Sequence, residues 1–66
     1  MNARLEPLFV NVKEAAAFLG LEPFRIYELL NSGEVAGRYD GRKRLVSVRS
    51  LREFAENLPT ERPEAS

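Results

Sequence analysis

The side chains of this sequence that could do chemistry are mainly basic, and they are unevenly distributed. Ten Lys and Arg residues balance ten Asp and Glu residues, so the net charge is zero. Between positions 38 and 52, however, six basic residues stand against the single acid Asp40: Arg38, Arg42, Lys43, Arg44, Arg49 and Arg52. From Glu53 to the C-terminus four acids stand against Arg62. Basic side chains grouped in this way attract anionic partners, and the backbone of a nucleic acid is the first candidate.

Catalytic chemistry has little support in the composition. The chain contains neither Cys nor His, which removes the usual zinc ligands, the common general base, and the Ser/His and Cys/His nucleophile pairs. The carboxylates are spread among basic residues on short helices, which is the pattern of a solvated surface. We therefore expect no enzymatic activity, no metal site and no cofactor.

Length limits the architecture to one domain. A chain of 66 residues buries only about 60% of the surface that it exposes when unfolded, so it supports one modest core. No apolar run approaches the roughly 20 residues that span a bilayer, and the N-terminus lacks the charged and apolar regions of a signal peptide. We expect a cytoplasmic protein with no membrane partner.

Two short helices are predicted in the first half of the chain. Asn11 is a favoured N-cap with Glu14 in the capping-box position, apolar residues recur at helical spacing over 12–19, and Gly20 ends this helix. Glu22 and Pro23 open the second helix, which has the apolar stripe Ile26, Leu29 and Leu30 and ends at Asn31, Ser32 and Gly33. Only residues 20–22 separate the helices, so they must cross steeply in a helix-turn-helix arrangement.

A hairpin and a third helix are predicted in the second half. Extended segments at 35–39 and 43–46 are joined by Asp40-Gly41, a turn sequence in which both positions tolerate positive φ. Ser47 is the expected N-cap of the third helix, Pro59 ends it, and its apolar positions are Leu51, Phe54, Ala55 and Leu58. The predicted fold class is mainly α with a small β-hairpin: a winged helix-turn-helix of three helices plus a wing.

The two ends of the chain are expected to lie outside the domain. Residues 1–7 are predicted to form a flexible N-terminal arm that leads into a short extended piece at 8–10. Residues 59–66 are rich in Pro and Glu and contain no large apolar side chain, so we expect a disordered acidic tail. The winged helix-turn-helix DNA-binding domain is thus predicted at 8–58.

The second predicted helix is the candidate recognition helix, because the N-terminal turn of such a helix reaches base edges in the major groove. Arg25 could take a guanine edge or a phosphate, and Phe24 could rest on a thymine methyl; the alternative is a solvated arginine and a core phenylalanine. Tyr27 is expected to pack its ring at the edge of the core with its hydroxyl outward. The predicted recognition-helix residues are Pro23, Phe24, Arg25, Tyr27 and Glu28.

The hairpin is the candidate wing. Basic residues on a rigid hairpin can follow the phosphate backbone or place a guanidinium in the minor groove, although a charge run is often only a solvated face. The predicted wing residues are Arg38, Arg42, Lys43 and Arg44, and strand alternation is expected to turn either Arg38 or Arg44 away from the DNA. Lys13, near the start of the first helix, is a further candidate for a phosphate contact.

Residues 10–58 resemble the excisionase family of MerR-like winged helix-turn-helix proteins. Four pieces in the same order carry the resemblance: V-K-E-A-A-A-F-L-G at 12–20, I-Y-E-L-L-N-S-G at 26–33, G-R-K-R at 41–44, and the closing helix at 47–58. This sequence departs from the family at Glu22, Pro23 and Phe24, where Ser or Thr is usual, and at Arg44, where an aromatic residue is common in the wing.

The resemblance implies a recombination directionality factor of a phage or prophage. Such a protein binds and bends double-stranded attachment-site DNA so that a tyrosine or serine integrase works toward excision, and it would reside in the cytoplasm of the host cell. Other copies of the chain on the same DNA are expected partners. Two alternatives stay open: a small phage-type transcriptional regulator with the same fold, and a protein-interaction adaptor that uses exposed Phe24 and Tyr39.

Overall fold

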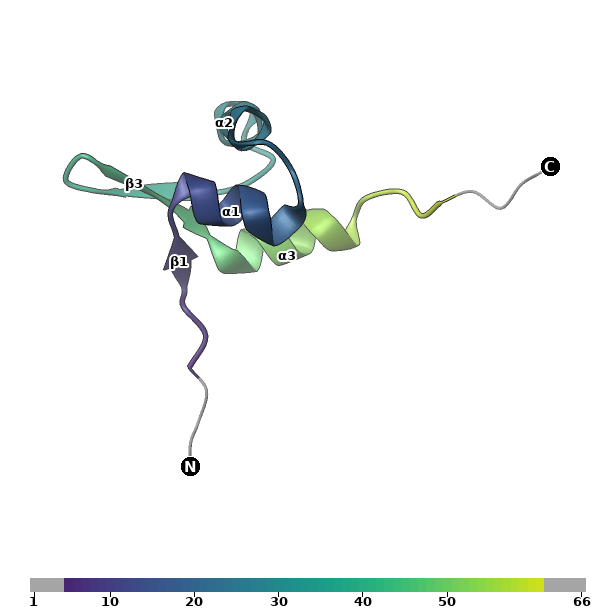
Figure 1. Cartoon of the computed structure of the whole chain (residues 1–66), viewed down its shortest axis with the longest axis horizontal. Helices are drawn as coiled ribbons and strands as arrows, with labels where there is room; N and C mark the ends of the chain where they lie inside the picture. The colour runs from purple at the N-terminus through teal and green to yellow at the C-terminus, as the bar shows by residue number, and fades with distance from the viewer. Residues whose placement is uncertain (1–4, 62–66) are drawn as a thin grey trace.

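Three helices and a three-stranded antiparallel sheet make up the fold of the computed structural model, which describes residues 5–61 (Figure 1). The elements follow the order β1 (Phe9–Val10), α1 (Val12–Leu19), α2 (Pro23–Ser32), β2 (Gly37–Asp40), β3 (Lys43–Ser47) and α3 (Val48–Glu56). This is the predicted winged helix-turn-helix, with β2 and β3 as the wing. The predicted arm at 1–7 and tail at 59–66 fall largely outside the described residues.

The helix-turn-helix is held by the predicted caps. Asn11 Oδ1 accepts a hydrogen bond of 2.7 Å from the Glu14 backbone N–H, and Glu14 Oε1 accepts one of 3.0 Å from the Asn11 N–H, which completes the capping box. Gly20 ends α1 with φ 72°, and Gly33 ends α2 with φ 84°. In Figure 1, α1 lies across the view while α2 is seen almost end-on above it, so the short connection does force a steep crossing.

The core lies where the two helices meet the sheet and α3. Its largest fully buried side chains are Ile26, Leu29, Val35, Val46 and Leu51. On α1 the buried positions include two alanines, Ala15 and Ala16, whose small side chains leave room for α2 to approach. The predicted burial of Leu29 and Leu51 is confirmed, whereas Phe54 is only partly buried against this cluster.

The predicted apolar stripe of α3 is wrong at its C-terminal end. The helix stops at Glu56, the Asn57 side-chain Nδ2 donates to the Glu53 carbonyl at 3.0 Å, and Leu58 lies beyond the helix with 50% of its surface exposed. Ala55 is exposed as well. Figure 1 shows the last turn of α3 extending past α1, so no neighbouring element is there to cover these two side chains.

The sheet differs from the prediction in its turn and in its third strand. Asp40 is paired with Lys43, so the turn consists of Gly41 and Arg42 instead of Asp40 and Gly41. Only Gly41 has positive φ, at 65°, which fits a turn with glycine at the first central position and leaves Asp40 extended. The extended piece predicted at 8–10 is a strand at its last two residues, and β1 pairs with β3 to give the order β1-β3-β2.

The strand predicted to begin at Val35 begins two residues later, at Gly37. Val35 is buried, and its N–H donates to the Leu29 carbonyl at 3.2 Å, so this residue closes α2 onto the core. The Ala36 N–H donates to Ser50 Oγ on α3 at 2.8 Å. These two bonds occupy the donors that a sheet ladder would otherwise use.

Candidate nucleic-acid interface

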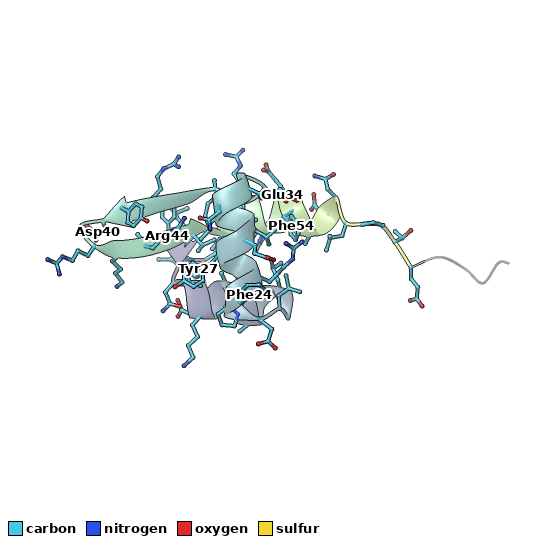
Figure 2. All side chains as sticks on the ribbon, turned by 90° about the horizontal axis from the view of Figure 1, so that it is seen from above. Phe24, Tyr27, Glu34, Asp40, Arg44 and Phe54 are labelled. Carbon is cyan, nitrogen blue, oxygen red and sulfur yellow. The ribbon has the colours of Figure 1, made fainter. Side chains whose placement is uncertain are left out.

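The exposed side of α2 carries two large aromatic side chains. Phe24 is 68% exposed and Tyr27 is 46% exposed, so neither fills the core. Seen from above, α2 crosses the front of the domain, with Phe24 near one end and Tyr27 on the side that faces the wing (Figure 2). The core alternative for Phe24 is therefore wrong, and Tyr27 exposes much of its ring as well as its hydroxyl.

Arg25 and Glu28 form an ion pair on the same helix. Arg25 NH1 donates to Glu28 Oε1 at 3.3 Å, and their side chains are 44% and 49% exposed. An exposed pair of this kind contributes little stability, but it fixes the direction of the guanidinium. A guanidinium and a carboxylate held side by side offer a donor for guanine and an acceptor for the cytosine amino group. Pro23, the first residue of α2, is also exposed.

The register of the hairpin separates the basic residues of the wing. Tyr39 is paired with Arg44, and Gly37 with buried Val46, so these pairs share the face of the hairpin that is turned toward the core and α2. Arg38 and Lys43 belong to the alternate pairs and lie on the opposite face. The prediction that strand alternation would separate Arg38 from Arg44 is confirmed, and Arg44 is the one turned toward α2.

Arg44 connects the wing to α2. Its guanidinium carbon lies 5.9 Å from the centre of the Tyr27 ring and 5.6 Å from the centre of the Tyr39 ring, within the range of cation–π attraction. Figure 2 shows Arg44 on the wing beside Tyr27. Of the eight basic side chains in residues 5–61, Arg44 alone is partly buried, while the others are exposed.

The remaining charges fall into two groups. Arg42 lies in the turn at the tip of the wing, and Lys43 follows it, both exposed. Arg49 and Arg52 are on α3, where they are paired with Glu53 at 3.8 Å and with Glu6 at 2.8 Å. The basic run at 38–52 therefore divides into a wing with four cations and an α3 pair compensated by neighbouring acids. Lys13 is exposed on the first turn of α1.

Two residues of this surface were missed from the sequence. Tyr39 was considered only for protein binding, because the predicted turn did not place it opposite Arg44. Asn31 is exposed on α2, four residues after Tyr27 and three after Glu28, so it continues their face. Helical spacing alone could have identified Asn31, whereas Tyr39 required the correct turn.

Other kinds of site have no counterpart in the part of the chain that the structure describes. Within residues 5–61, no group of three or more His, Cys, Asp or Glu side chains is placed to hold a metal ion. The helices found there are all too short or too polar to cross a bilayer.

The steeply crossed helices, the exposed second helix and the basic hairpin define a helix-turn-helix domain of the winged type. The family model described as a helix-turn-helix domain matches residues 9–59, and the chain belongs to this family, a DNA-binding family that includes excisionase-like proteins. No match was found among curated proteins or among solved structures. The partner that the domain supports is double-stranded DNA.

Proposed function

We propose that this protein is an excisionase, a recombination directionality factor of a phage or prophage. It binds and bends attachment-site DNA so that a tyrosine or serine integrase works toward excision. It does so by positioning DNA, without catalysing a reaction itself.

One observation carries the proposal: a single surface runs from the outward side of α2 across Arg44 to the tip of the wing. The aromatic and charged residues of α2 are exposed on it, and the turn residue Arg42 extends it beyond the core. Residues with no role in the core, gathered on a helix-turn-helix domain, match what DNA recognition requires. The membership of excisionase-like proteins in the same family supports the finer assignment.

In the proposed complex, α2 enters the major groove. Phe24 meets a thymine methyl, and the Arg25–Glu28 pair meets base edges or a phosphate. The wing then lies along the adjacent backbone with Arg42 and Lys43, where attraction to phosphate is independent of sequence. Sequence preference comes from α2, and most of the salt-dependent affinity comes from the wing.

Several copies act together on the natural site in this proposal. A single small module buries only about 600 to 1,000 Å² on DNA, which is low for a specific complex. Neighbouring copies supply further affinity when the basic wing of one approaches exposed Glu53 and Glu56 on α3 of the next. Within its own chain Glu53 has only a long ion pair of 3.8 Å with Arg49, so it can be shared. A regular repeat of such contacts lets curvature accumulate along the DNA.

The test of the proposed function is footprinting of the purified protein on DNA that spans an integrase gene and its attachment site in the parent genome. We expect protected, regularly spaced sites beside the attachment core, with enhanced cleavage where the duplex bends. In a reconstituted reaction, addition of the protein should raise excision by the integrase and lower integration. Arg42→Gln is the matched control, since it weakens DNA contact without touching the core.

Protection confined to a promoter, with no effect on the integrase, would instead identify a small transcriptional regulator. Failure to shift any DNA in a gel assay would reject both DNA-binding functions. It would favour the adaptor, for which Phe24 and Tyr39 offer 68% and 67% exposed aromatic side chains.

Cooperation between copies has a separate test. Titration into a fragment with several sites should show steep filling, and charge reversal at Glu53 and Glu56 should reduce this cooperativity while binding to one isolated site stays the same. Independent filling of the sites, unaffected by those changes, would remove the contact between copies.

A further inference from the structure

We infer that Tyr27, Arg44 and Tyr39 form a preorganised phosphate clamp at the junction of α2 and the wing. In this clamp Arg44 binds one phosphodiester of the DNA strand that separates the groove entered by α2 from the groove beside the wing. Tyr27 and Tyr39 are positioning residues that hold the guanidinium. The inference rests on the proposed DNA binding and deepens it.

The first step is the unusual environment of Arg44. It comes from β3, its cross-strand partner Tyr39 comes from β2, and Tyr27 comes from α2, so three elements meet at one guanidinium. Both rings lie within 6 Å of it, at 5.9 and 5.6 Å. Contacts with aromatic rings engage the flat face of a guanidinium and leave the N–H groups at its edge free to donate.

The second step is the absence of a competing anion. Arg25, Arg49 and Arg52 each have a carboxylate within 4 Å. Among the described residues no carboxylate lies at that distance from Arg44, and no protein acceptor takes a hydrogen bond from it there. A cation that is partly buried, held by rings and left without an anion is ready for an external one.

The third step is the kind of anion that fits. The guanidinium lies between a helix suited to the major groove and a hairpin suited to the adjacent backbone, so the anion is a phosphate of the strand between them. Arginine binds a phosphate through two parallel N–H donors, which requires a defined orientation of the guanidinium plane. The two rings provide that orientation before DNA arrives, and less side-chain freedom is lost on binding.

The clamp can be tested with the full chain and a short mixed-sequence duplex, by measuring affinity at several salt concentrations. Arg44→Gln should lower the salt slope by about 0.9, the value for one phosphate contact. Tyr39→Leu and Tyr27→Leu should each weaken binding by roughly two- to fivefold in the parent protein. The same changes should have no effect when Arg44 is already glutamine. Tyr39→Phe and Tyr27→Phe, which keep the rings, should bind like the parent.

Arg42→Gln is the control that separates this inference from the proposed function. It should lower the salt slope too, but its effect should add independently to that of Tyr39→Leu, because Arg42 lies in the turn. If Arg42→Gln lowers the slope while Arg44→Gln does not, DNA binding stands and the clamp is rejected. Equal losses from ring removal with and without Arg44 would also reject it. If the parent protein binds no duplex, the proposed function itself fails.

Folding is checked by circular dichroism on every variant. Tyr39 is 67% exposed and Tyr27 46% exposed, so their replacement leaves the core intact. Arg44→Lys adds a final measurement: it keeps the charge and much of the slope but loses the planar contact, so Tyr39→Leu should weaken it less than it weakens the parent. An equal loss in both backgrounds would overturn the positioning role of the rings.

Discussion

Replacing Leu29 by alanine should separate the core of this fold from its surface. Leu29 is fully buried in the middle of α2, and its carbonyl accepts the N–H of Val35, which closes α2 onto the core. Removing its branched end leaves a cavity lined by apolar side chains. Large-to-small changes at such sites cost about 2 to 5 kcal/mol.

The size of this loss is large for so short a chain. At roughly 0.05 to 0.15 kcal/mol per residue, a protein of 66 residues has a free energy of unfolding of about 3 to 10 kcal/mol. Leu29→Ala therefore removes a large share of the total. With about 4 to 8 °C of melting temperature per kcal/mol for a small domain, the expected decrease is about 8 to 40 °C.

Leu58→Ala is the matched control, because it is the same chemical change at a residue that the sequence also predicts as apolar core. Leu58 is 50% exposed beyond the end of α3, so its replacement should change stability by no more than about 0.5 kcal/mol. The assay is thermal and urea unfolding followed by far-ultraviolet circular dichroism. Similar melting of the parent and Leu29→Ala, or equal loss in both variants, would refute the assignment of the core.

Three further predictions concern the caps, the turn and the DNA surface. Ser47→Ala removes the hydroxyl that accepts a 3.1 Å hydrogen bond from the first turn of α3, so urea unfolding should show a loss of about 1 kcal/mol. Gly41→Val places a branched side chain at φ 65°, and a loss of about 1 to 2 kcal/mol with a disturbed wing should appear in urea unfolding and in NMR spectra. Arg42→Ala with Lys43→Ala should weaken specific and random DNA alike and flatten the salt dependence by up to about 0.9 per contact, whereas Arg25→Ala should cost about 1 to 3 kcal/mol mainly on the specific site. Equal losses on both kinds of DNA would make Arg25 a phosphate contact only.

The sequence by itself determined the helices of this protein and their caps. The capping box at Asn11 and Glu14, the proline that opens α2 and the glycine that ends it are all found where the sequence predicts them. Each of these signals acts between residues no more than four apart, so it can be recognised without knowledge of the rest of the chain. The apolar stripe of α2 was predictable for the same reason.

Only the tertiary structure decided which side chains of the surface meet. A turn at Gly41 and Arg42, in place of Asp40 and Gly41, sets Tyr39 opposite Arg44, and packing of the hairpin against α2 then places Tyr27 beside them. The ion pair of Arg52 with Glu6 joins residues 46 positions apart, which no local pattern contains. Leu58 continues the helical stripe in sequence, yet the fold provides no element to cover it. Strand register, long-range charge pairing and burial depend on how the elements pack, and local spacing leaves them open.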